Sequence, residues 1–344
     1  MLKKSFVVLL AMVLVFALLG GCAQKSDVYE FRLAHFFPGT HPAETVLLTQ
    51  WISEIEEATD GKVKITSYPG ETLLGAPAIY GGVVDGVADM GLSCFAYTRG
   101  RFPVLEVFEL PGVVYNNSSV ASKVAWEGIQ AMNPAGVQDT KLLMVFATGP
   151  GDLFTKTPVR ILEDLRNMEI RATGISVKVL ELLNANPNAM SQGEAYEALS
   201  RGAISGNLSP IEVLKGWRQA EVTSYITLTP FLYNTLFFIN VNNQKWDALP
   251  EELQKIVLDV TARVYEETAV GLWDVQNADA LTWIEETQNM EIIELSAAEQ
   301  ARWKEKVSVM LENYKVEITT KGHDGAQIVQ TVLDLADTYN GIYR

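Results

Sequence analysis

The stretch Met168 to Gly174, which reads Met-Glu-Ile-Arg-Ala-Thr-Gly, places one arginine where it could bind an anion. Apolar and polar residues alternate here with period two, which predicts a short strand that turns into a helix after Gly174. Arg171 would point away from the core at the carboxyl end of that strand, where α/β domains form their ligand crevice. Its planar guanidinium suits a carboxylate. The alternative is a surface arginine paired with Glu163 or Asp164.

The segments around this stretch alternate between strand and helix patterns, which predicts an α/β fold with a partly parallel sheet. Strands are expected over residues 29–34, 63–68, 88–92, 141–147, 187–190, 204–209 and 237–241. Helices are expected over residues 42–59, 76–84, 118–132, 194–201, 297–315 and 325–340. The sequence Thr-Gly-Pro-Gly-Asp at 148–152 interrupts this pattern and predicts the first crossing into a second α/β unit.

One segment near the end predicts an unusually long helix. No proline follows Pro250, and apolar residues keep a helical spacing from Glu251 to about Thr287. A helix of that length would extend on the order of 50 Å, more than one small domain. Two stacked helices with a break at Gly271 are the alternative.

The first 21 residues predict a secretory signal. Lys3 and Lys4 precede an apolar run over residues 6–19 that is short for a membrane span, and the segment ends in Leu-Gly-Gly-Cys22. That end resembles the lipobox of bacterial lipoproteins, which implies cleavage before Cys22, a lipid on its thiol, and residues 22–28 as a tether. An ordinary signal peptide or a retained single-helix anchor are the alternatives.

Charge and cysteine content exclude several classes of function. Removal of residues 1–21 would delete only Lys3 and Lys4, leaving 25 basic and 42 acidic residues and a net charge of −17, so nucleic acid is not an expected partner. If Cys22 is acylated, Cys94 is the one remaining thiol and no internal disulfide can form. With three histidines and no Cys-x-x-Cys or His-Glu-x-x-His motif, the sequence predicts no metal site and no cofactor.

Several short motifs in a fixed order together resemble one family. They are Ala34-His35 with Pro42, Gly-Lys-Val-Lys-Ile at 61–65, Tyr-Gly-Gly-Val-Val-Asp-Gly at 80–86, Leu110-Pro111, Leu-Glu-Asp-Leu at 162–165 before Ile170-Arg171, Tyr-Glu-Ala-Leu at 196–199 with Gly202, and Trp-Asp-Ala-Leu-Pro-Glu-Glu-Leu-Gln at 246–254. Over roughly residues 29–339 the chain resembles the DctP-type solute-binding proteins of tripartite ATP-independent periplasmic (TRAP) transporters.

The resemblance implies two α/β lobes joined by hinge strands, with one long helix packed across both. We expect lobe I to comprise residues 29–148 plus 236–276, and lobe II residues 149–235 plus 277–344. A small organic acid would bind between the lobes, and the loaded protein would deliver it to a separate membrane permease driven by an ion gradient. Apart from the permease, the lipid anchor is the only expected contact with the membrane.

Under this resemblance Arg171 corresponds to the carboxylate-binding arginine of the family. Core packing is the alternative role for the aromatic residues Phe36, Phe37, Phe95, Tyr97 and Phe154. Cys94 is favoured as a small buried hydrophobe. Asn234 could instead cap a turn, and His35 could satisfy a loop carbonyl. The other expected ligand-binding residues are Ser209, Gln192, Asn234, His35, Phe36, Phe37, Cys94, Phe95, Tyr97, Asp152 and Phe154.

Departures from the family pattern narrow the expected ligand. Many relatives have Asp-Gly where this chain has Ser205-Gly206, asparagine in place of Ser209, and an aromatic residue in place of Gln192. Relatives that bind large acidic sugars add a second arginine at the position of Gly151. One cation is therefore expected, unless Arg99 supplies another. A monocarboxylate, with aromatic and hydroxylated acids among the candidates, is favoured over a dicarboxylate.

Two rival functions make different demands on the sequence. A periplasmic hydrolase would need a nucleophile with a base, a paired acid and base, or a metal, and no such set has usable spacing. We therefore expect no enzymatic activity. A sensor domain that hands its ligand to a receptor would share the same sequence features.

Overall fold

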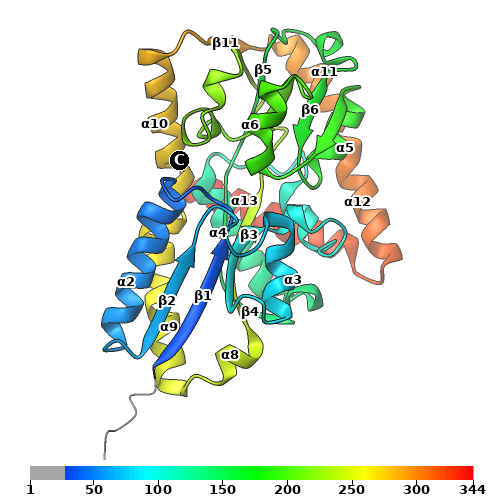
Figure 1. Ribbon diagram of the computed structural model, residues 1–344. Helices are drawn as coiled ribbons and strands as arrows, with labels where there is room; N and C mark the ends of the chain where they lie inside the picture. Colours follow the sequence, from blue (N-terminus) through cyan, green and yellow to red (C-terminus); the bar gives the residue numbers. More distant parts are fainter. Residues whose placement is uncertain (1–27, 344) are drawn as a thin grey trace, which may run out of the picture.

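The computed structural model describes residues 28–343. Two mixed α/β halves lie end to end, each with its own sheet, and give an elongated molecule (Figure 1). The predicted signal segment and Cys22 lie outside the described residues. Within residues 28–343, no helix is both long and apolar enough to cross a membrane.

The first sheet has five strands in the order β2-β1-β3-β10-β4. Strands β1, β2 and β3 are parallel, and β10 runs antiparallel to both of its neighbours. All seven residues of β10 are buried, which fits an apolar segment in the middle of a sheet. The strands are β1 (Tyr29–His35), β2 (Val63–Tyr68), β3 (Met90–Cys94), β4 (Thr140–Ala147) and β10 (Leu236–Asn242).

The second sheet has six strands in the order β11-β9-β5-β8-β6-β7. Here β6 lies between β7 and β8 and is parallel to both, whereas β5 is antiparallel to β8 and β9. The sequence patterns indicated β6, β7 and β8, but not the short strands β5, β9 and β11. The strands are β5 (Asp152–Thr155), β6 (Glu169–Ala172), β7 (Asn186–Ala189), β8 (Gly206–Ser209), β9 (Tyr225–Leu228) and β11 (Glu291–Glu294).

Helices cover both sheets. Helices α2, α3, α4 and α9 pack against the first sheet, and α5 packs on β6 and β7 of the second. The α-helices are α2 (Thr49–Ala58), α3 (Ile79–Val84), α4 (Ser118–Met132), α5 (Ser176–Leu182), α6 (Gln192–Ser200), α7 (Val213–Gly216), α8 (Asn243–Asp247), α9 (Glu251–Val264), α10 (Leu272–Thr287), α11 (Ala297–Val307), α12 (Val309–Thr320) and α13 (Gly325–Ile342). Two π-helical turns (Ala43–Leu48, Tyr265–Ala269) and six 3₁₀ turns (Ala76–Ala78, Phe95–Tyr97, Leu105–Glu109, Ala135–Val137, Leu162–Leu165, Gln219–Glu221) complete the described elements.

The predicted long helix is present as α9 and α10, joined by the π-helical turn over Tyr265–Ala269. Gly271 follows this irregular section as the N-cap of α10, so the regular helix is interrupted beside the glycine that the sequence marked. Helix α9 runs beside the first sheet and α10 beside the second half (Figure 1). Both halves are therefore linked by one helical segment as well as by extended chain.

Two extended segments cross between the halves side by side. The first leaves β4 at residues 148–151, and the second returns to β10 at residues 229–235. They are hydrogen-bonded to each other, Thr148 N to Thr235 O at 3.0 Å and Gly151 N to Tyr233 O at 3.2 Å. Gly149 has φ +68°, and a Cβ there would lie 2.6 Å from the Ser118 nitrogen, so this hinge position requires glycine.

Helix α13 packs against α4, beside the first sheet, and α12 connects it to α11 near the second. The chain therefore passes along both halves again at its end. We predicted that residues 277–344 belong to lobe II. Because that assignment concerns which residues move together, it stays a prediction.

Candidate functional site

Arg171 lies on β6, between the two parallel strands β7 and β8, with only 2% of its surface exposed. Its guanidinium donates from Nε to the Met190 carbonyl at 3.1 Å and from Nη1 to Ser209 Oγ at 2.9 Å. Nη1 also contacts Asn207 Oδ1, and Nη2 contacts Tyr97 Oη, both at 3.4 Å. All of these partners are neutral.

The buried charge of Arg171 therefore has no counter-ion among residues 28–343. The alternative of a surface arginine paired with Glu163 or Asp164 is wrong. Glu163 pairs with Arg302, and Asp164 accepts hydrogen bonds from the chain at Arg160 and Ile161. An isolated buried cation is strongly unfavourable, so a guanidinium held in this way is ready to pair with an anion from outside the protein.

A small cavity between the two halves is lined by Arg171. Both sheets and their loops contribute, since Cys94 and Phe237 come from the first sheet and Arg171 and Ser209 from the second. We call this cavity the binding pocket. It is lined by Phe36, Phe37, Cys94, Tyr97, Thr148, Arg171, Thr173, Gln192, Ser209, Pro210, Glu212, Val213, Trp217, Tyr233, Thr235 and Phe237.

Three polar atoms of the binding pocket are buried without a hydrogen-bond partner in the described structure. They are Gln192 Nε2, Thr173 Oγ1 and Trp217 Nε1. The side chains of Gln192 and Thr173 are each only 5% exposed. Leaving a buried donor unpaired costs about 1–3 kcal/mol, so three such groups beside an unpaired guanidinium indicate a site for oxygen atoms of a ligand.

Aromatic rings form the walls of the binding pocket. Phe36 lies nearly parallel to Trp217, with ring centroids 6.0 Å apart and an interplanar angle of 19°. Tyr97 meets Phe36 edge to face at 5.3 Å. Because burial raises the pKa of the Tyr97 phenol well above its ordinary value, this hydroxyl stays neutral and can donate. The rings offer flat apolar surface next to a few polar anchors, as in most small-molecule sites.

A carboxylate that the sequence did not single out also lines the binding pocket. Glu212 follows β8 and begins α7, and its Oε2 lies 3.2 Å from His41 Nε2 in the opposite half. His41 Nδ1 accepts a hydrogen bond from Ala43 N at 3.0 Å. The ring proton therefore sits on Nε2, and a neutral His41 donates to Glu212.

Comparison with known proteins places this architecture in a family. Residues 33–317 match the bacterial extracellular solute-binding proteins of family 7, the DctP family. The chain therefore belongs to the DctP-type solute-binding proteins of TRAP transporters. Proteins of this family bind small organic acids outside the cytoplasm, work with a TRAP permease, and are substrate-binding proteins rather than enzymes.

Three similar proteins extend over nearly the whole chain. The ectoine/5-hydroxyectoine-binding periplasmic protein UehA of Ruegeria pomeroyi is 25% identical over 94% of this chain and 95% of its own. A TRAP solute-binding protein of Desulfovibrio salexigens, solved with the C-terminus of a symmetry mate in its ligand site, is 35% identical (TM-score 0.79; 92% and 98% covered). A marine metagenome TRAP protein specific for aromatic acids, solved with 3-hydroxybenzoate, is 28% identical (TM-score 0.85; 91% and 99% covered).

For this TRAP solute-binding protein, seven of the predicted ligand-binding residues meet at the binding pocket. They come from five separate segments of the sequence, which the fold of the two halves brings together. They are Arg171, Ser209, Gln192, Phe36, Phe37, Cys94 and Tyr97. Burial raises the pKa of the Cys94 thiol well above its ordinary value, so this residue is a small neutral surface rather than a nucleophile.

The five other predicted residues line other parts of the structure. His35 Nε2 lies 3.0 Å from both Glu44 Oε2 and Ser67 Oγ, and Asn234 Nδ2 donates to the Phe108 carbonyl at 3.0 Å. Asp152 Oδ1 accepts from Thr229 N at 2.7 Å. Phe95 and Phe154 pack in apolar clusters. Each of these five side chains already has partners within the protein, and a direct role for them in binding stays a prediction.

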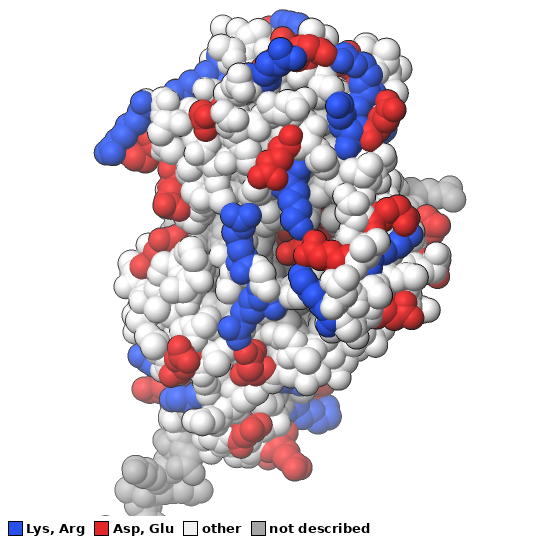
Figure 2. Space-filling view, turned by 90° about the vertical axis from the view of Figure 1, so that its right-hand side faces the viewer, with Lys and Arg blue, Asp and Glu red and all other residues white. Residues whose placement is uncertain are grey.

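Neither Gly151 nor Arg99 provides a second cation to the binding pocket in this structure. A Cβ at Gly151 would lie 2.5 Å from Tyr233 Cδ1 and 2.8 Å from the Ser209 carbonyl, so no larger side chain fits there. Arg99 faces a neighbouring cavity, which it shares with Lys178 and Glu317. That cavity lies where α5 and α12 meet the first half, on a face where acidic and basic side chains are interspersed (Figure 2).

Sequence reasoning missed Trp217 and Glu212 as lining residues. Both follow β8 in an irregular segment around the four-residue helix α7, where no periodic pattern indicates a direction for the side chains. The position of Pro210 directly after a strand that ends at the crevice was the one available signal.

Proposed function

We propose that this protein captures a monocarboxylic acid with an aromatic ring and delivers it to a TRAP permease. The observation that carries the proposal is the buried Arg171 guanidinium with neutral protein partners, set in a pocket with aromatic walls. A ligand carboxylate would supply the missing counter-charge and accept from nearby unpaired donors such as Gln192 Nε2. Charge-assisted hydrogen bonds of this kind are among the strongest in proteins.

A single carboxylate is favoured because Arg171 is the one Lys or Arg side chain that lines the binding pocket in the described chain. The tight packing at Gly151 supports the same conclusion, since it leaves no room for a second arginine. The Desulfovibrio protein offers a parallel, because a polypeptide C-terminus, which occupies its ligand site, ends in one carboxylate.

An aromatic ring is favoured by the shape and surface of the walls. Phe36, Phe37, Tyr97 and Trp217 present ring faces and edges to the pocket. Aromatic pairs of this geometry contribute about 0.5–1.5 kcal/mol beyond the burial of their area. The marine protein, which binds 3-hydroxybenzoate, has the same fold and supports this choice.

Mass spectrometry on ligand released by denaturing the purified protein tests the proposal. We expect an aromatic monocarboxylate, and calorimetry with benzoate and 3-hydroxybenzoate should give saturable binding at one site per chain. An aliphatic dicarboxylate as the bound species, with no binding of either benzoate, would contradict it. We also propose that the protein does not transform its ligand, so the acid should be recovered unchanged after long incubation.

We propose further that the mature protein is anchored through a lipid on Cys22. The support is the Leu-Gly-Gly-Cys sequence at the end of an apolar segment, which resembles a lipobox. Replacement Cys22→Ser removes the thiol that would carry the lipid, so the protein should move from the membrane to the soluble extracytoplasmic fraction. A variant that stays with the membrane would show that residues 6–19 act as the anchor.

A further inference from the structure

We propose that Glu212 makes the binding pocket reject a second negative charge and select aromatic acids whose other substituent is neutral and can donate a hydrogen bond. The inference rests on the proposed function and adds to it a residue that discriminates among aromatic acids. It requires that Glu212 share the pocket with Arg171, that its charge be uncompensated, and that one ligand meet both groups.

The position of Glu212 is well defined. Its side chain is only 4% exposed and lines the binding pocket together with Arg171. Its backbone nitrogen donates to Asn277 Oδ1 at 3.2 Å, which ties the start of α7 to α10. Its carboxylate accepts from His41 Nε2 at 3.2 Å, across the boundary between the halves. Glu212 is therefore held at the pocket wall by its backbone contact to Asn277 and its carboxylate contact to His41.

No lysine or arginine among residues 28–343 lies within ion-pair distance of this carboxylate. Because Ala43 N donates to His41 Nδ1, the imidazole is the neutral form with its proton on Nε2. The basic residue of α7, Lys215, pairs instead with Asp279 at the surface.

One ligand would meet both charged groups because the pocket is small. Arg171 and Glu212 both line it, and Ser209, three residues before Glu212, accepts from the Arg171 guanidinium at 2.9 Å. An aromatic acid whose carboxylate binds Arg171 therefore has its ring substituents near the rest of the wall, Glu212 included. A second carboxylate there would meet a like charge at low dielectric, whereas a hydroxyl or amide could donate to it.

Two probes of nearly the same shape isolate the charge. Isophthalate and 3-carbamoylbenzoate differ in whether the second substituent is an anion or a neutral amide donor. By calorimetry, the wild-type protein should bind 3-carbamoylbenzoate at least tenfold more tightly than isophthalate. Equal affinities would overturn the inference without any substitution.

The replacement Glu212→Gln keeps the length of the side chain and an oxygen that can accept from His41, but removes the charge. It should reduce the ratio of the two affinities at least tenfold, mainly by tightening isophthalate. Glu181→Gln, at an exposed glutamate outside the binding pocket, is the matched control and should leave the ratio unchanged. Thermal melting followed by circular dichroism shows that each variant is folded.

The outcomes separate the two proposals. If the wild type binds benzoate but the Glu212→Gln variant keeps the wild-type ratio, the inference fails and the proposed function stands. If the wild type binds none of benzoate, 3-carbamoylbenzoate and isophthalate, the proposed function fails and the inference fails with it.

Discussion

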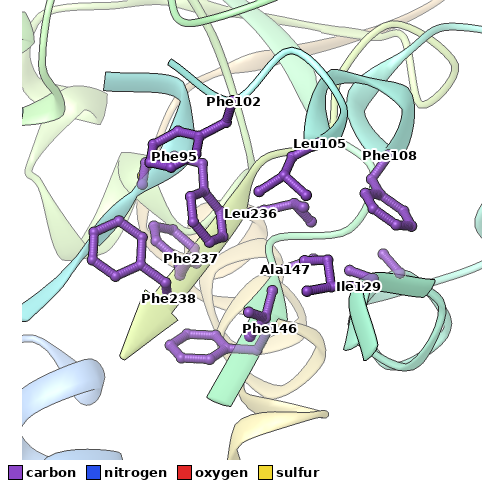
Figure 3. Close-up of a cluster of buried hydrophobic side chains, with 14 of the residues drawn as sticks. Phe95, Phe102, Leu105, Phe108, Ile129, Phe146, Ala147, Leu236, Phe237 and Phe238 are labelled. Atoms are coloured by element: carbon purple, nitrogen blue, oxygen red, sulfur yellow. The ribbon is translucent and has the colours of Figure 1, made fainter. Parts of the chain in front are cut away.

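Strand β10 separates two aromatic regions that differ in whether their polar groups have partners within the protein. Phe237, on one face, lines the binding pocket, and the next residue, Phe238, points to the other face and packs with Tyr80 and Phe95. Phe102 packs edge to face on Phe95, and we call Tyr80, Phe95, Phe102 and Phe238 the aromatic core cluster. Figure 3 shows Phe95, Phe102 and Phe238 among the buried side chains around β10, together with Phe237. The rings of the aromatic core cluster contact one another at centroid distances of 4.7–6.4 Å.

The two regions have similar rings but different polar groups. In the aromatic core cluster, the Tyr80 hydroxyl is hydrogen-bonded to Asp139, so the polar group is satisfied within the protein. In the binding pocket, Arg171 has no counter-ion in the described chain, and Gln192 Nε2 has no partner. Between these two regions, the buried cation without an ion-pair partner therefore marks the site better than aromatic content does.

The largest expected change in free energy is a loss of stability when Phe238, in the aromatic core cluster, is replaced. Phe238→Ala would leave a cavity among packed rings and should lower the free energy of unfolding by about 3–5 kcal/mol. Benzoate affinity, measured by calorimetry well below the melting temperature, should change little. Phe237→Ala should lose both stability and affinity. If the two variants weakened binding equally, the division at β10 would be wrong.

The next largest expected change is a loss of ligand affinity when Arg171, in the binding pocket, is replaced. In Arg171→Ala a bound carboxylate would be desolvated without its partner, which typically costs about 2–5 kcal/mol, or roughly thirty-fold to several thousand-fold in affinity. Arg171→Lys keeps the charge but loses the planar fork, so its affinity should lie in between. Arg302→Ala, at a surface arginine paired with Glu163 and Glu299, is the control and should bind like wild type.

Thermal melts of the same proteins sharpen this prediction. Arg171→Ala should fold as stably as wild type or more so, because a buried cation without a counter-ion destabilises the unliganded protein. A large loss of stability together with a normal affinity per folded molecule would show that Arg171 has a structural role.

A smaller effect is expected at Glu109, a buried carboxyl that accepts from Leu236 N at 2.9 Å, at the start of β10. The pKa of Glu109 is raised to about 8, mainly because the carboxyl is buried. The hydrogen bond from Leu236 N lowers this pKa, and the negative charge of Glu106 raises it further. Unfolded glutamate has a pKa of about 4.3. Between these values the folded protein holds a proton that the unfolded chain has lost, so stability is highest below pH ~4 and falls as pH rises towards 8.

Replacement Glu109→Gln should remove this contribution. Between pH 5 and 7 the wild type should lose on the order of 2 kcal/mol more stability than the variant, as measured by denaturant unfolding at several pH values. The matched control, Glu181→Gln, should follow the wild type. Parallel pH profiles for wild type and Glu109→Gln would show that the carboxyl is ionised in the folded protein as well.

Much of the fold could be predicted from the sequence because periodic patterns are local. Val63–Tyr68 and Ser118–Met132 form the strand and the helix that their spacing indicated, and Asn117 caps that helix by accepting from Val120 N. The strands β5, β9 and β11 were missed because their pairing depends on partners far along the chain, β5 with β8 and β9, and β9 with β11.

The candidate site was predictable only in part. Arg171 was indicated by its place at the end of a recognisable strand, whereas Ser209 and Gln192 were proposed from the family resemblance. Phe95 and Phe36 could not be told apart by residue type, since one packs in the core cluster and the other lines the pocket. Phe36 follows β1 and Phe95 begins the 3₁₀ turn after β3, so the difference depends on the tertiary contacts of two separate segments.

The most direct test of the central claim is a crystal structure of the protein with benzoate bound. The account predicts carboxylate oxygens within hydrogen-bond distance of the Arg171 guanidinium and Gln192 Nε2, with the ring in contact with Phe36 and Trp217. Benzoate in this pocket with its carboxylate away from Arg171, or benzoate bound only elsewhere on the protein, would contradict it.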